Sequence, residues 1–153
     1  MPSTSPSPTV RLLARFSLAA FVAVIFFGTV RSAPTSLHAT LAALPEAERA
    51  MASFHAHFDA LCFVGSAALA LALHLLGEAG APAWAARVLG LGYVAGSVVF
   101  SAGYAVKSLG LAFGLPALVR PLSLVLISGG GLLLIAAAGA AVLVLRGSRR
   151  ASP

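Results

Sequence analysis

The chain alternates between long apolar stretches and short polar segments. Four stretches consist almost entirely of hydrophobic and small residues, at positions 12–30, 54–76, 88–106 and 122–145. At 1.5 Å per residue, each is long enough to cross a hydrocarbon layer of ~30 Å as a helix. We therefore predict an all-α fold, an integral membrane four-helix bundle.

Composition supports this prediction and excludes a soluble domain. Of the 153 residues, 59% are hydrophobic and only 9% are charged, whereas soluble domains carry roughly 25% charged residues. The net charge of +6 does not indicate nucleic-acid binding, because the basic residues are scattered at predicted helix ends and form no stripe. The single cysteine, Cys62, excludes an intrachain disulfide and a metal site made of cysteines alone.

The pattern predicts one transmembrane domain over residues 10–147. Residues 1–9 are rich in proline and serine and are expected to be disordered, and residues 148–153 form a basic polar tail. The first apolar stretch partly resembles a signal peptide, but no A-x-A site follows it and Pro34 is a poor residue after a cleavage point. We predict that it is a retained anchor.

The loops predict the direction in which the chain crosses the membrane. In the longest loop, Pro45, Glu46 and Glu48 read as a helix start that runs into the second span. Six basic residues lie on the side of the two termini: Arg11, Arg15, Arg87, Arg146, Arg149 and Arg150. Four lie on the opposite side: Arg31, Arg49, Lys107 and Arg120. The excess predicts that both termini are cytoplasmic.

The second apolar stretch contains a cluster of ionisable residues, His55, His57 and Asp59. Such groups are costly in a membrane unless they face the bundle interior or the interface. With four spans, the cluster shares a membrane face with Ser101 and Tyr104 of span three and with Ser123 of span four, so a polar layer is predicted there. His74 is expected at the other face.

Helical spacing separates the two histidines. His55 and Asp59 are four residues apart and share a face, whereas His57 points nearly the opposite way. A mononuclear zinc site is therefore disfavoured. Asp59 could orient His55 by a hydrogen bond, which leaves His57 free to face another helix, a second subunit or a cofactor. His55 as the ligand, proton or ion handling, and purely interfacial histidines are the alternatives.

Spans three and four are marked by small residues. Gly92, Gly96 and Gly103 fall on one face of span three, and span four contains glycines at 129–131 and 139. Close helix packing, including packing between subunits of a homo-oligomer, or contact with a flat ligand explains such faces. Beside the glycines runs a second stripe of span three, formed by Tyr93, Ser97, Phe100 and Tyr104. This stripe either packs against a neighbouring helix or forms a pocket wall that presents Tyr104 to a ligand.

The segment 55–64, HAHFDALCFV, resembles the His-Ala-His…Leu-Gly-Phe-Val helix of small proteins related to heme-copper oxidase subunit I. In those proteins a histidine of the motif is a heme ligand. Cys62 replaces the usual glycine, and Asp59 stands where asparagine is common.

The overall layout resembles styrene oxide isomerase, a family of small four-span proteins. On a gapless placement of residues 88–104, Tyr104 falls on the family's functional tyrosine and His57 takes its heme-ligand position. Gly96 stands where that family has a functional aspartate, and Phe63 where it has an asparagine. An uncharacterised four-span bacterial inner-membrane family also has a similar first loop, with Leu44-Pro45-Glu46.

These resemblances imply a bacterial inner-membrane protein that binds heme b through His57, with His55 as second choice and Asp59 beside them. The isomerase family converts an epoxide to an aldehyde, with ferric heme as a Lewis acid at a subunit interface. The resemblance thus implies a small lipophilic substrate and Tyr104 lining the site. The alternative is a non-enzymatic four-span membrane protein with no cofactor.

Overall fold

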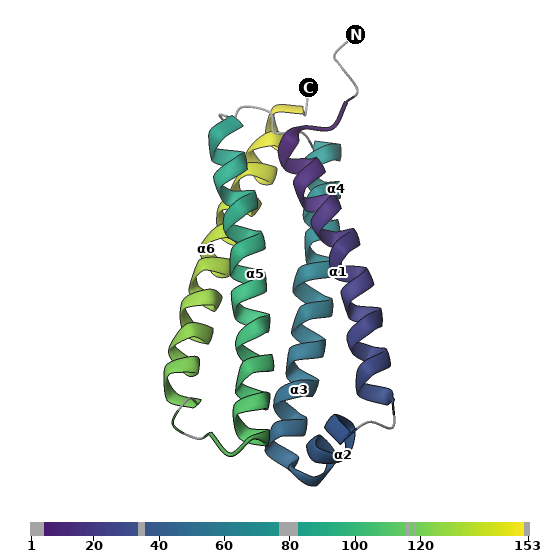
Figure 1. Ribbon diagram of the computed structural model, residues 1–153. Helices are drawn as coiled ribbons and strands as arrows, with labels where there is room; N and C mark the ends of the chain where they lie inside the picture. The colour runs from purple at the N-terminus through teal and green to yellow at the C-terminus, as the bar shows by residue number, and fades with distance from the viewer. Residues whose placement is uncertain (1–4, 34–35, 77–82, 116, 118, 152–153) are drawn as a thin grey trace.

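The computed structural model describes residues 5–33, 36–76, 83–115, 117 and 119–151, and every element among them is helical. The elements in chain order are α1 (Pro8–Ser32), α2 (Ser36–Ala43), α3 (Pro45–His57), the π-helix η1 (Phe58–Gly65), α4 (Ser66–Leu76), α5 (Ala83–Ala112) and α6 (Val119–Ala151). α3, η1 and α4 follow one another without a break and together form the second long helix (Figure 1).

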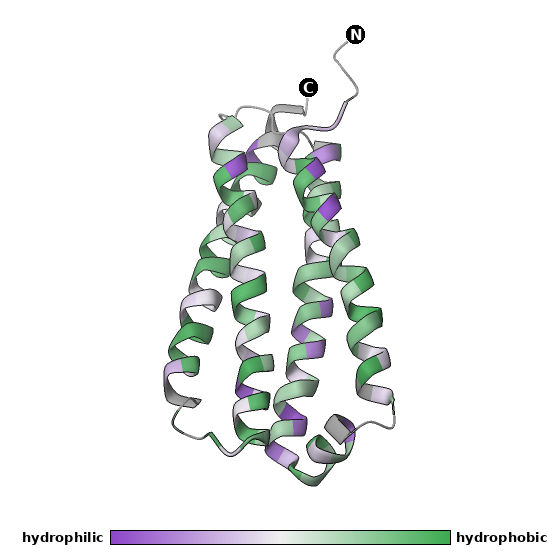
Figure 2. Cartoon of the chain, viewed as in Figure 1, coloured by the Kyte–Doolittle hydropathy of each residue, from purple (hydrophilic) through white to green (hydrophobic). Residues whose placement is uncertain are grey.

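Four of these helices are long and apolar enough to cross a membrane, which confirms the predicted all-α membrane bundle. Their bounds are Pro8–Val30, Pro45–Leu75, Ala83–Ala112 and Pro121–Arg146. Figure 2 shows them coloured mostly hydrophobic, with hydrophilic positions near the ends and along the second span.

The terminal helices extend beyond the predicted domain limits. α1 begins at Pro8, and the Ser7 hydroxyl accepts a hydrogen bond from the Val10 amide at 3.2 Å, a regular N-cap. α6 continues to Ala151. Residues 1–4 and 152–153 of the two predicted polar tails lie outside the described residues. The start of α1 and the end of α6 lie at the same end of the bundle (Figure 1), as an even number of crossings requires.

α5 is the central helix of the fold. It packs against α6 along one side and against α3, η1 and α1 along others, whereas α6 packs mainly on α5 and to a smaller extent on α4. Near the termini, a buried cluster joins α1, α4, α5 and α6: Val10, Leu13, Ala70, Leu73, Tyr93 and Ala136. The second span is thus held between α1 and α5.

Glycines bring α5 and α6 into backbone contact. A Cβ built on Gly96 would lie 2.7 Å from the backbone nitrogen of Leu133, and one on Gly129 would lie 2.8 Å from that of Phe100. The predicted small-residue faces therefore serve close packing inside the chain, where dispersion forces act between the two backbones. A homo-oligomer stays a prediction.

We predict that Gly96→Ala destabilises the protein and that Gly131→Ala does not. The alanine at 96 forces two backbones apart, and overpacking of this kind costs about 1–3 kcal/mol. At Gly131 nothing lies within 4 Å of the added Cβ, and alanine gains up to about 1 kcal/mol in helix propensity. Thermal unfolding in detergent micelles compares the two variants, and equal effects would contradict this packing.

Candidate functional site

The histidine cluster lies well inside the second span. The expected helix start at Pro45, with Glu46 and Glu48 in the first turn, is confirmed, and acidic side chains there complement the helix dipole. The membrane-length helix thus begins nine residues before the predicted apolar boundary at Phe54, since it runs from Pro45 to Leu75. His57 is about 18 Å along this helix.

His57 has a fixed tautomer. Its Nδ1 lies 2.6 Å from the backbone carbonyl oxygen of Ser53, one turn earlier in α3. A carbonyl oxygen can only accept, so Nδ1 carries the hydrogen and donates it. In the neutral ring, Nε2 then holds the lone pair, which is the state that a histidine needs to bind a metal.

The His57 ring packs against two aromatic residues of α5. It stacks on Tyr104 with ring centres 4.9 Å apart and planes 11° apart, and it meets Phe100 edge-on at 5.1 Å. Phe100 and Tyr104 also contact each other at 5.6 Å. The expected meeting of span two with Tyr104 is therefore confirmed. Stacking covers a face of the His57 ring, whereas a metal binds in the plane of the ring. These contacts therefore do not block the lone pair of Nε2.

His55 points the other way, toward α1, as the helical spacing predicted. Its Cε1 would lie 3.6 Å from a Cβ built on Gly28. Among the described residues, its ring is the one ionisable side chain lining a cavity of about 260 Å³ between α1, α2, α3 and α5. The other lining residues are apolar: Phe26, Phe27, Val30, Leu41, Met51, Phe54, Ala105 and Leu109. The two histidines thus serve different faces of α3.

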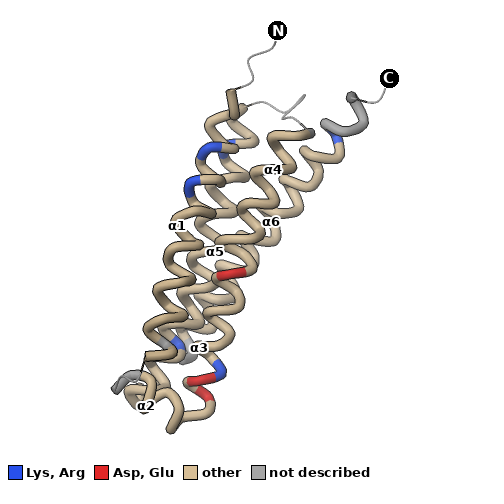
Figure 3. Tube along the Cα trace, turned by 90° about the vertical axis from the view of Figure 1, so that its right-hand side faces the viewer, with Lys and Arg blue, Asp and Glu red and all other residues tan. Residues whose placement is uncertain are grey.

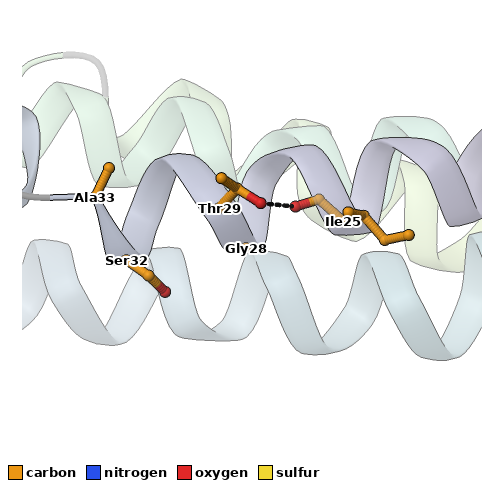
Figure 4. A pocket seen from close by; sticks show the side chains of 5 residues that line it. All are labelled: Ile25, Gly28, Thr29, Ser32 and Ala33. Carbon is orange, nitrogen blue, oxygen red and sulfur yellow. Dashed lines mark hydrogen bonds between the residues drawn. The ribbon is translucent and has the colours of Figure 1, made fainter.

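The end of α1 beside this cavity offers little further chemistry. An open hollow there is lined by Ile25, Gly28, Thr29, Ser32 and Ala33 (Figure 4). The Thr29 hydroxyl donates to the Ile25 carbonyl oxygen at 2.9 Å, within its own helix. That bond satisfies the hydroxyl locally.

Asp59 is half-buried in η1 and lies near the midpoint of the second span. Figure 3 shows an acidic segment between the two ends of the bundle where most charges gather. No hydrogen bond joins Asp59 to His55 within the described residues. The π-helix begins between them, and its i→i+5 bonding changes the angular step on which the expected pairing depended. The ring that is oriented by a hydrogen bond is His57, through Ser53.

Hydroxyl groups bind the carbonyls of the π-helix. Tyr93 of α5 donates to the Leu61 carbonyl oxygen at 3.2 Å, and Ser17 of α1 donates to that of Phe63 at 3.0 Å. Ser66 donates to the carbonyl oxygens of Cys62 and Phe63. Three consecutive carbonyls in the middle of the span, those of residues 61–63, thus accept hydrogen bonds from side-chain hydroxyls.

A row of hydroxyl-bearing residues on α5 faces the second span along its length. Its members are Tyr93, Ser97, Ser101, Tyr104 and Ser108. Ser108 donates to the Ala47 carbonyl oxygen at 2.7 Å, and the Ser101 hydroxyl lies 3.8 Å from the Cys62 sulfur. The sequence analysis identified this row except for Ser108. It also did not identify Ser53 of α3 or Ser66 of α4 as part of the site. Continuing the helical spacing past Tyr104 would have found Ser108.

Within the part of the chain that the structure describes, no three His, Cys, Asp or Glu side chains come together to hold a metal ion. No protein family, curated protein or solved structure matches the chain.

We predict that Tyr93→Phe destabilises the π-helix. The ring stays but the bond to Leu61 is lost, and hydrogen bonds between membrane helices contribute on average about 0.6 and at most about 1.7 kcal/mol. Amide hydrogen exchange across 58–65 should become faster, and the unfolding midpoint should fall. Ser128→Ala is the control, because that exposed hydroxyl bonds only to Leu124 of its own helix. A shift no larger than the control's would refute the role given to Tyr93.

Proposed function

We propose that this multi-pass membrane protein binds heme b, and that Nε2 of His57 would hold the iron. One observation carries the proposal: the Nδ1–Ser53 hydrogen bond leaves Nε2 as the metal-binding nitrogen. We further propose that the protein lies in the bacterial inner membrane with both termini cytoplasmic.

The surroundings of His57 suit a flat, apolar cofactor. Phe100 and Tyr104 supply aromatic surface beside the ring, and His57 and Tyr104 are only half-buried, so a ligand can approach from the membrane. Asp59 and His55 remain proposed neighbours of the cofactor. Because His55 faces α1, it is the second choice as ligand.

A catalytic role, if present, is proposed to be isomerisation of a small lipophilic epoxide to a carbonyl compound. Heme iron supplies a Lewis acid for the epoxide oxygen. The protein's own proposed contribution is the Tyr104 hydroxyl, which would donate a hydrogen bond to that oxygen as negative charge develops. No oxidant or reductant is needed, because epoxide and carbonyl product are isomers.

The alternative is a non-enzymatic membrane protein without a cofactor. The observation that favours it is the completeness of His57 packing within one chain, since Ser53 takes its hydrogen and Tyr104 covers its ring. In that case His57 serves to join α3 to α5.

We predict that the purified protein shows the Soret absorption band of heme and that His57→Ala abolishes it. His74→Ala is the matched control, because His74 is exposed on α4 near the other end of the span. In His57→Gly, added imidazole should restore the band by replacing the missing ligand. Absence of the band from the wild-type protein, even after reconstitution with heme, would leave the cofactor-free alternative.

We predict that Tyr104→Phe keeps the heme band but slows epoxide isomerisation about a hundredfold, the effect of removing one donor to a developing oxyanion. Ser128→Ala is the control, because that exposed hydroxyl bonds to Leu124 of its own helix, so its rate should change only slightly. Carbonyl product formation by detergent-purified protein measures both rates. Equal rates for the two variants would remove Tyr104 from the reaction.

A further inference from the structure

A second opening between α3 and α5 lies at the α2 end of the bundle. This groove, of about 360 Å³, is lined by Glu46, Arg49, Ala50, Ser53, Tyr104, Lys107 and Leu111. Unlike the cavity beside His55, it carries charge. Its inner end adjoins His57, because Ser53 and Tyr104 both line the groove and contact the His57 ring.

The groove has an excess of positive charge. Arg49 projects from α3 and Lys107 from the facing α5, against one carboxylate, Glu46. Arg49 is exposed and Lys107 is half-buried. Within the described residues, neither cation forms an ion pair. An anion that sits between them would therefore gain two charge-assisted contacts without displacing an existing salt bridge.

The depth of the two cations matches a lipid headgroup. Arg49 lies four residues after Pro45, and Lys107 lies five residues before Ala112, so each is about 6–8 Å from a span end. The second span, with 31 residues, is about 46 Å long and exceeds a ~30 Å hydrocarbon layer by about 8 Å at each end. Both side chains therefore lie at the depth of the headgroups, whereas Tyr104 lies further toward the centre of the membrane.

We propose that this groove binds an anionic phospholipid, with the phosphate between Arg49 and Lys107. Basic pockets between membrane helices recognise such headgroups. The groove is large enough for the phosphate and glycerol of one lipid but not for its chains, which remain in the bilayer. This inference does not depend on heme, because it uses residues at headgroup depth only.

Titration of the detergent-purified full chain with phosphatidylglycerol, followed by native mass spectrometry, tests the proposal. Phosphatidylcholine with the same acyl chains provides the zwitterionic comparison. The double variant Arg49→Gln/Lys107→Gln should bind phosphatidylglycerol about 25-fold more weakly, since each cation near a headgroup contributes about fivefold. Binding of phosphatidylcholine should not change.

Two further variants separate a built site from general surface charge. Arg87→Gln removes an exposed cation at the opposite end of α5 and should leave Kd unchanged. Glu46→Gln removes the one carboxylate among the described residues that line the groove and should tighten binding. The proposal is overturned if the double variant binds like the wild type, or if Arg87→Gln weakens binding as much. Unchanged unfolding midpoints establish that each variant is folded.

Discussion

The need to satisfy backbone carbonyls inside an apolar layer governs this structure. In hydrocarbon no water is present to bind them, so a departure from regular helix requires partners from the protein itself. The π-helix η1 makes that departure in the middle of the second span. Hydroxyls of Ser17, Tyr93 and Ser66 meet the need and draw α1 and α5 onto the same segment. The position of His57, immediately before the π-helix, follows from these bonds.

α5 is central because its faces use two different kinds of contact. Toward α6 it presents glycines, and the backbones touch where a side chain would not fit, as at Gly96. Toward the second span it presents hydroxyls and aromatic rings that contact carbonyls and His57. The first contact depends on close approach and the second on directional bonds, so one fixes the distance between helices and the other their register.

The sequence was sufficient for the coarse fold and for part of the site. Apolar run lengths predicted four spans, helical spacing predicted opposite directions for His55 and His57, and span order predicted that His57 and Tyr104 would lie toward the same membrane face. The π-helix could not be predicted, because its stability comes from hydroxyls distant in sequence, such as Ser17. The missed Ser53 contact uses a backbone carbonyl, which no residue pattern reveals. The start of the second long helix was predicted, because Pro45 and the acids Glu46 and Glu48 mark it independently of the apolar run.

The second ring nitrogen of His57, Nε2, distinguishes a histidine that binds a cofactor from one that only packs. Ser53 takes the Nδ1 hydrogen and Tyr104 covers the ring, yet no group in the described part of the chain donates to Nε2. In the proposed heme complex the iron would take this lone pair, for which the hydrocarbon of a membrane offers no hydrogen-bond donor. The hydrogen bond to Ser53 therefore satisfies Nδ1 and leaves Nε2 as the nitrogen that is open to a ligand.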